Sequence, residues 1–132
     1  MKILIRFLRL FFILIIGIAA YSAMAADSKS AFGELSEKCT YPQQPSIPNG
    51  SKASKDEMLA AQKSIKEYQA QAQDFRTCID NMIAVWDSQG GEADEIALKK
   101  TTAVDFYNKS VADEEQVADL FNTAIRAYKT KN

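Results

Sequence analysis

A long helical pattern of apolar residues is the feature that most constrains how this chain can fold. Nine apolar positions follow one another at alternating spacings of three and four residues from Met58 to Trp86. This period places all of them on one face of a helix and is typical of a coiled-coil seam. Ser54 and Glu57 form the pattern of a capping box just before the first of them. The sequence therefore predicts an amphipathic helix over residues 54–87.

A second helical pattern follows a break that contains two glycines. Gly90 and Gly91 have low helix propensity and permit the backbone to reverse direction. Beyond them an apolar residue recurs every seven positions, at Ala97, Val104, Val111, Ala118 and Ile125. Gly and Pro are absent from residue 92 onward, which favours one continuous helix over residues 92–129. A bend or break near Ser110 is the alternative, because Ser110 is a polar residue inside the stripe.

Two helices of nearly equal length joined by a short glycine turn predict an all-α fold, an antiparallel two-helix hairpin with coiled-coil-like packing. The core seam is expected to consist of the larger apolar residues on the two stripes. These residues are Met58, Ile65, Tyr68, Phe75, Ile79, Met82, Trp86, Val104, Tyr107, Val111, Phe121, Ile125 and Tyr128. Some of the aromatic side chains could instead anchor a partner, but their periodic placement favours a role in the core.

Residues 26–53 are expected to add a third layer, because two helices alone bury little surface in a chain this small. The segment contains all three prolines of the chain and should therefore be extended. Phe32 and Leu35 indicate a short helical turn near its start. Tyr41 and Ile47 are the expected inward anchors of this proline-rich strap.

The two cysteines, Cys39 and Cys78, allow a single intramolecular pairing. In an oxidising compartment such an isolated pair is expected to form a disulfide. A catalytic dithiol is disfavoured because the close Cys-x-x-Cys spacing is absent. At about 3.1 Å per residue, the extended segment can reach from Ser54 back to Cys78 along the first helix. The disulfide would then hold the strap in place and add about 3–4 kcal/mol to the stability in the chain-entropy model.

Residues 1–25 have the pattern of a cleaved secretory signal. Basic residues near the start precede an unbroken apolar stretch, and Ala23-Met24-Ala25 is a small-x-small cleavage site. An uncleaved membrane anchor is the alternative, since the apolar run over residues 10–26 lies at the lower limit for spanning a bilayer. The polar stretch that follows favours cleavage. The sequence thus predicts a periplasmic or secreted protein without a stable membrane span.

Composition excludes several functional classes. The chain has no histidine, which removes His-dependent catalytic triads, His-ligated metal sites and imidazole pH switches. Without its first 25 residues, which carry three basic side chains, it would hold 13 basic and 17 acidic side chains. Such an acidic balance does not favour nucleic acid as a partner. We expect no metal and no cofactor.

Candidate functional residues are few. The clusters Asp94-Glu95 and Asp113-Glu114-Glu115 could serve acid–base chemistry, which requires a desolvated cleft. A two-helix hairpin offers little concavity, so we expect these acids to lie on a solvated face and expect no catalytic residue. Asp87, Ser88 and Gln89, beside the glycine turn, form the one candidate recognition tip.

Three stretches of the sequence stand out together: C-T-Y-P-Q-Q-P-S-I-P-N-G at residues 39–50, the Glu57-Met58 helix start, and R-T-C-I-D-N-M around the second cysteine. In these stretches the chain resembles a group of small exported proteobacterial helical proteins of unknown function. A fainter likeness is found in F-N-T-A-I-R-A-Y-K near the end. The resemblance implies an envelope location and supplies no activity.

These observations lead to the expectation of a non-enzymatic binding, adaptor or structural protein of the cell envelope. It would be a monomer or weak homodimer with a protein partner of unknown identity. One alternative is a homo-oligomeric coiled coil, in which the regular seam pairs between chains. The other is a hydrolase or a hydrolase inhibitor, the inhibitor acting through the tip at residues 87–89.

Overall fold

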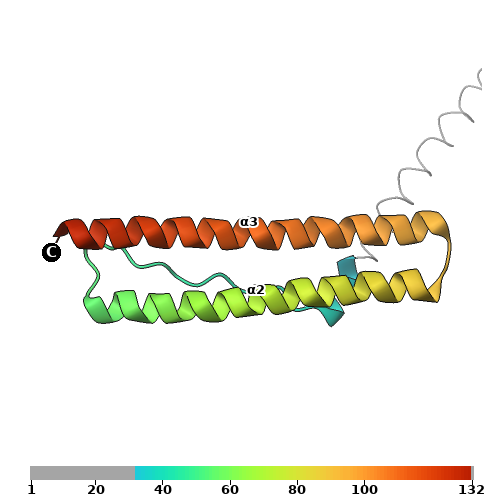
Figure 1. Cartoon of the computed structure of the whole chain (residues 1–132), viewed down its shortest axis with the longest axis horizontal. Helices are drawn as coiled ribbons and strands as arrows, with labels where there is room; N and C mark the ends of the chain where they lie inside the picture. Colours follow the sequence, from blue (N-terminus) through green and yellow to red (C-terminus); the bar gives the residue numbers. More distant parts are fainter. Residues whose placement is uncertain (1–31, 132) are drawn as a thin grey trace, which may run out of the picture.

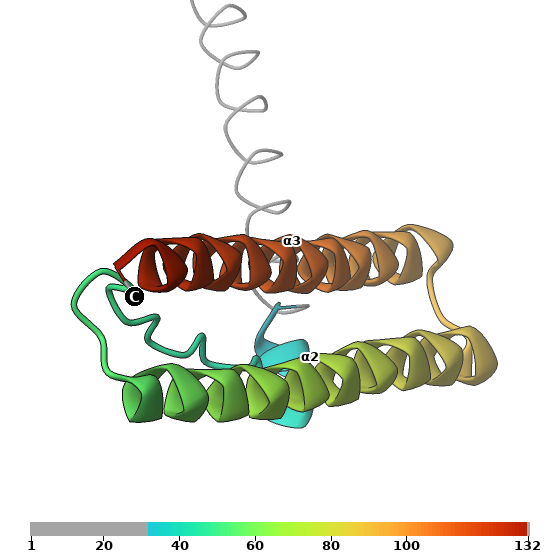
Figure 2. The ribbon, with the colours of Figure 1, turned by 60° about the vertical axis from the view of Figure 1, so that its left-hand side comes forward.

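The computed structural model describes residues 32–131, so the predicted signal sequence lies outside the described residues. The described part of the chain is helical, with a helical segment at residues 32–38, α2 (Lys55–Gln89) and α3 (Ala93–Lys131). The predicted all-α class is therefore confirmed for this part. Figures 1 and 2 show α2 and α3 side by side, joined by a short turn, with an extended stretch of chain running along them. None of the helices in this range combines the length and apolar character needed to cross a bilayer.

The ends of α2 follow local signals in the sequence. The Ser54 hydroxyl accepts a hydrogen bond from the Glu57 amide at 3.2 Å, and the Glu57 carboxylate accepts one from the Ser54 amide at 2.6 Å. These reciprocal bonds form the predicted capping box and satisfy amides that a helix start leaves unpaired. The helix continues to Gln89, slightly beyond the predicted end, and stops at Gly90 and Gly91. Their φ angles of 69° and 150° lie in a region that favours glycine.

α3 runs without interruption through Ser110, the position at which a break was the alternative. The Ser110 side chain is fully buried. Its hydroxyl donates to the Tyr107 carbonyl at 2.8 Å and accepts from the Arg76 guanidinium at 3.4 Å. The helix tolerates this polar group in its buried face because the hydroxyl has both a donor and an acceptor as partners.

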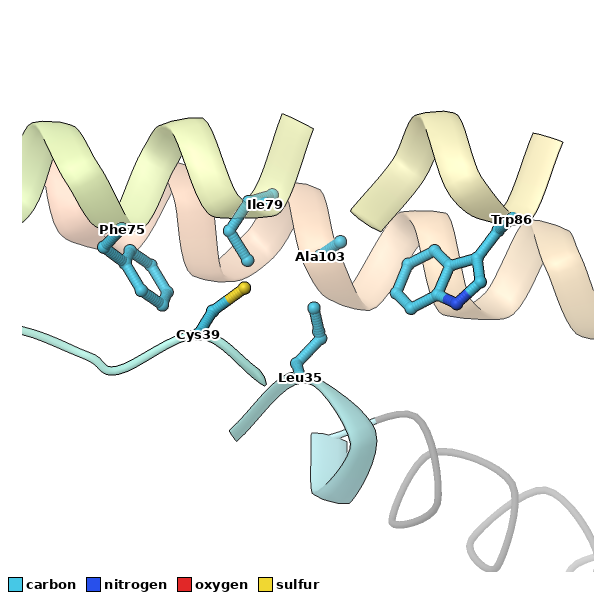
Figure 3. Packing of buried hydrophobic residues seen from close by; sticks show 6 residues of the cluster. All are labelled: Leu35, Cys39, Phe75, Ile79, Trp86 and Ala103. Atoms are coloured by element: carbon cyan, nitrogen blue, oxygen red, sulfur yellow. The ribbon is translucent and has the colours of Figure 1, made fainter. Parts of the chain in front are cut away.

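The face of α3 that packs on α2 differs from the predicted face by one residue. The buried residues of α3 are Ala103, Ser110, Val117 and Ala124. Each of these residues lies one position before a member of the predicted repeat. Val104, a member of that repeat, is 46% exposed, so its assignment to the core seam is wrong. The reason is side-chain size. Small residues of α3 lie against larger residues of α2, as Ala103 does beside Ile79 (Figure 3), and this lets the two helices approach closely.

The buried face of α2 is large and apolar. Its buried apolar residues are Met58, Ala61, Ile65, Tyr68, Ala72, Phe75, Ile79 and Trp86, and Met82 is half-buried. The other seam candidates on α3, which are Tyr107, Val111, Phe121, Ile125 and Tyr128, are half-buried and flank the row of small residues. Arg76 is buried within the α2 face, at a position that the periodicity did not identify.

The N-terminal segment, defined here as residues 32–53, packs against both helices and not only against α2. Cys39 and Cys78 form the disulfide predicted from the sequence. Leu35 and Cys39 point toward the helix pair and join a cluster with residues of α2 and α3 (Figure 3). Farther along, Ile47 packs against buried residues of both helices. The N-terminal segment thus contributes to the core of the molecule.

Candidate functional site

An apolar pocket lies where the N-terminal segment crosses the helix pair, next to the disulfide. Its volume is about 320 Å³. The lining residues are Phe32, Leu35, Ser36, Cys39, Thr40 and Tyr41 from the N-terminal segment, Phe75 from α2, and Phe106 and Lys109 from α3. This volume falls within the range of small-molecule sites, which are concave, mostly apolar and carry a few polar groups. The expectation that the fold offers little concavity is therefore wrong at this place.

Four of the nine residues that line the pocket are aromatic. Phe32 and Phe106 are stacked with their ring centroids 5.1 Å apart. The ring of Tyr41 meets Phe75 edge-on at 4.9 Å and Phe106 at 6.4 Å. Such offset and edge-to-face pairs are favourable arrangements for aromatic side chains. The rings therefore hold one another in place and give the pocket a defined shape.

A compact polar network closes one side of the pocket. The Tyr41 hydroxyl donates to the Asp113 carboxylate at 2.7 Å. The Lys109 ammonium contacts the same carboxylate at 2.6 Å, donates to the Tyr41 oxygen at 3.4 Å and lies 5.1 Å from the centroid of the Tyr41 ring. The lysine charge is therefore balanced within the network, and α3 is tied to the N-terminal segment.

The network sets the protonation of its members. The hydrogen bond from Lys109, followed by that from Tyr41, holds the pKa of Asp113 below its usual range. Burial, followed by the hydrogen bond to Asp113, raises the pKa of Tyr41 to about 12. At neutral pH, Asp113 is thus ionised and Tyr41 keeps its proton. Neither group is tuned to exchange protons near neutrality, as a general acid or base would be.

One of the two acidic clusters departs from the solvated face that the sequence predicted. Asp113 belongs to the network at the pocket, and Glu114 forms an ion pair with the buried Arg76 at 2.9 Å. Glu115 is exposed, as expected. In the other cluster Asp94 and Glu95 are exposed, as expected, and Glu95 pairs with Lys99 at 3.0 Å. Sequence reasoning missed the role of residues 113–114 because Arg76 and Tyr41, which bind their carboxylates, lie far away along the chain.

A second set of polar contacts holds the helical segment at residues 32–38 against the far end of the helix pair. The Trp86 indole donates to the Glu34 carboxylate at 3.1 Å. Lys99 pairs with the same carboxylate at 3.3 Å. These contacts lower the pKa of Glu34, chiefly through the Trp86 hydrogen bond. One wall of the pocket is thus fixed by a hydrogen bond and an ion pair in addition to the nearby disulfide.

The predicted recognition tip is part of α2 and not a protruding loop. Asp87, Ser88 and Gln89 form the last turn of this helix. Asp87 pairs with Lys100 of α3 at 2.9 Å, and the Ser88 hydroxyl donates to the Val85 carbonyl at 2.8 Å. Gln89 is exposed. Two of the three candidate tip residues therefore make contacts within the helix pair.

Other site chemistry is sparse in the described residues. Residues 32–131 contain no cluster of three or more side chains that could hold a metal ion. A more polar hollow of about 480 Å³ adjoins the apolar pocket and shares Cys39, Thr40, Tyr41 and Phe75 with it. Sequence reasoning did not identify Phe106 as a site residue. Phe106 lines the pocket because a segment distant in sequence covers it, and the helical periodicity of α3 does not reveal such a contact.

Comparisons with protein-family models, with curated proteins and with solved structures gave no match to this chain.

Proposed function

We propose that this chain is an exported, non-enzymatic binding protein of the cell envelope, located in the periplasm or secreted. Its architecture would be an antiparallel, coiled-coil-like helical hairpin with a proline-rich strap pinned by the disulfide. The Cys39–Cys78 bond supports export, because disulfides persist mainly in oxidising compartments. The signal-like pattern at residues 1–25 supports the same location.

The observation that carries the binding role is the apolar pocket of about 320 Å³ beside the disulfide. Its wall consists mainly of aromatic and aliphatic side chains from three parts of the chain. The ionisable groups at its rim, Lys109 and Asp113, neutralise each other. A pocket with this lining can retain a ligand by excluding water, whereas acid–base chemistry would need a group free to gain or lose a proton.

The proposal is tested by recovering the tagged protein from its native envelope after mild crosslinking. Mass spectrometry then identifies co-purifying proteins, and solvent extraction recovers co-purifying small molecules. Ser36→Trp places a large side chain at the exposed rim of the pocket, and Glu37→Trp is the matched control on an exposed neighbour outside the lining. A species present with wild type and Glu37→Trp but lost with Ser36→Trp supports the proposal. Identical recoveries for all three proteins would contradict it.

The burial of the seam bears on the alternative of a homo-oligomeric coiled coil. Ile79 of the seam is completely buried in the single chain, which supports pairing of the seam within the chain. Ile79→Asp should then lower the melting temperature without changing the mass of the protein in solution. A change from dimer to folded monomer would instead support pairing between chains. The inhibitor alternative has less support, since Asp87 and Ser88 are held within the helix pair.

A further inference from the structure

We infer that the pocket beside the disulfide binds a small, uncharged, apolar molecule of two to three aromatic rings. The inference rests on the proposed function, in which this pocket is the binding site, and it adds the chemical class of the ligand. The volume of about 320 Å³ is roughly twice that of an engineered cavity of about 150 Å³ that binds benzene. The rings of Phe32, Tyr41, Phe75 and Phe106 line the pocket as stacked and edge-on pairs and give it apolar walls.

The charges at the rim select an uncharged ligand. Lys109 is the one ionic residue of the lining, and Asp113 holds its ammonium at 2.6 Å. An anionic ligand would have to compete with Asp113 for this ammonium. A cationic ligand would find the face of the Tyr41 ring already occupied by Lys109. A charged group would therefore enter the pocket without a free counter-charge, and burial of an unpaired charge is unfavourable.

Two hydroxyl groups of the lining, those of Ser36 and Tyr41, do not alter this selection. The Ser36 hydroxyl donates to the Gly33 carbonyl at 2.9 Å, and the Tyr41 hydroxyl donates to Asp113 at 2.7 Å. Both donors are thus engaged with partners inside the chain. The ligand would be held by apolar contact and ring stacking, with little demand for hydrogen bonds.

The pocket is preformed in the folded chain. Cys39 lies in its lining and is bonded to Cys78 on α2. Leu35 is only 3% exposed and fastens the helical segment to the same core cluster. Glu34 adds its contacts to Trp86 and Lys99. A site that is already ordered loses little conformational entropy when the ligand binds.

The test uses two dyes that share one skeleton. N-phenyl-1-naphthylamine is uncharged, and 8-anilinonaphthalene-1-sulfonate carries one added sulfonate. With the full chain purified in its oxidised form, we expect saturable binding of one uncharged dye per chain. The uncharged dye should bind at least about tenfold more tightly than the sulfonate, because the sulfonate lacks a free counter-charge. Equal or tighter binding of the sulfonate overturns the inference.

Variants locate the bound dye. Ser36→Trp should weaken binding of the uncharged dye about tenfold by filling the pocket, and Glu37→Trp should leave it unchanged. Trp86, the single tryptophan of the chain, belongs to the same core cluster as Leu35 and Phe75, so its emission in the wild type should transfer to the bound dye. This transfer shows that the dye binds at the part of the helix pair that carries Trp86, even if Ser36→Trp fails to fold. Dye binding without transfer from Trp86, or binding unaffected in a folded Ser36→Trp protein, overturns the inference.

Asp113→Asn tests the basis of the charge selection. The substitution removes the charge that neutralises Lys109, so binding of the sulfonate should strengthen relative to the uncharged dye. An unchanged ratio of the two affinities would contradict the assigned role of the Lys109–Asp113 pair.

Two further outcomes separate this inference from the proposed function. In one of them neither dye binds, while a species from the envelope is recovered with the wild type and lost with Ser36→Trp. In that case the ligand class is wrong and the binding function stands. If the protein is a dimer that Ser36→Trp dissociates into folded monomers, a second copy fills the pocket and the inference is overturned.

Discussion

The backbone of Gly50 lies directly against the backbone of Ala124 in α3. A β-carbon at Gly50 would overlap the Ala124 carbonyl oxygen. The φ angle of Gly50 is not positive, so the requirement for glycine comes from this close approach and not from backbone conformation. The contact brings the end of the proline-rich stretch onto α3, 74 positions away in sequence.

Gly50→Ala is expected to lower the free energy of unfolding by about 1–3 kcal/mol. The obstacle is helix backbone, which cannot rotate away as a side chain would. Urea denaturation measures the change. The matched control is Gly33→Ala, because a β-carbon at Gly33 meets nothing within 4 Å. Equal stabilities for the two variants would show that the N-terminal segment does not approach α3 as described.

The packing register of α3 can be tested at two adjacent residues. Ala103 is completely buried, whereas Val104 is 46% exposed. Ala103→Leu should destabilise the protein by about 1–3 kcal/mol by overpacking the interface. Val104→Ala should change the stability by no more than about 0.5 kcal/mol. Thermal or urea denaturation measures both changes. A larger loss of stability for Val104→Ala than for Ala103→Leu would show that α3 packs through the stripe predicted from the sequence.

The ion pair between Arg76 and Glu114 joins α2 and α3 inside the core. Its side chains are 10% and 25% exposed. Glu114→Gln leaves the guanidinium without a carboxylate and should lower the stability by up to about 3 kcal/mol. The double variant Arg76→Met, Glu114→Leu should recover most of that loss, because it removes both charges together. If the loss of stability in the double variant equals the sum of the losses in its two single variants, the two side chains do not interact.

The disulfide is expected to stabilise the fold by restricting the unfolded chain. Its cysteines are 39 positions apart, and closing a loop of this length contributes about 4 kcal/mol in the chain-entropy model. Cys78→Ser should therefore unfold at a lower urea concentration and expose the backbone amides of the N-terminal segment to hydrogen exchange. Under reducing conditions the wild type should match the variant. A wild type that stays more stable without its disulfide would argue against this mechanism.

Alkaline pH is expected to weaken the contact between Tyr41 and Asp113. The folded-state pKa of Tyr41, about 12, lies above the value of about 10 for an unfolded tyrosine. Tyr41 therefore contributes fully to stability below pH 10, and this contribution is lost as the pH rises through about 12. The pKa of Tyr68 is also raised by burial, so its contribution changes in the same direction.

Tyr41→Phe tests this pH dependence. At pH 7 the variant should be about 1 kcal/mol less stable than the wild type, because the hydrogen bond to Asp113 is lost. The stabilities of the two proteins should converge above pH 10. The wild type loses the stabilising contribution of the Tyr41 hydroxyl there, and the variant has no such hydroxyl. Stability curves that stay parallel up to pH 12 would show that Tyr41 does not titrate with a raised pKa.

The sequence by itself determined the helices and the covalent link. Local signals mark the helix ends, since the Ser54–Glu57 capping box and the glycines at 90 and 91 act on backbone groups a few residues away. The disulfide followed from the presence of only two cysteines. The apolar face of α2 was visible because its large side chains repeat with the helical period.

The tertiary structure decided the register of α3, the pocket and the ionic pairs. On α3 the inward positions hold small residues such as Ala103 and Ser110, which hydropathy alone does not distinguish from surface residues. Phe106 and Lys109 acquire a role only when the N-terminal segment crosses α3. The place of Gly50 depends likewise on a backbone contact with a distant helix. Each of these features arises between segments far apart in sequence, and such contacts depend on shape complementarity in the folded chain, which a one-dimensional pattern does not contain.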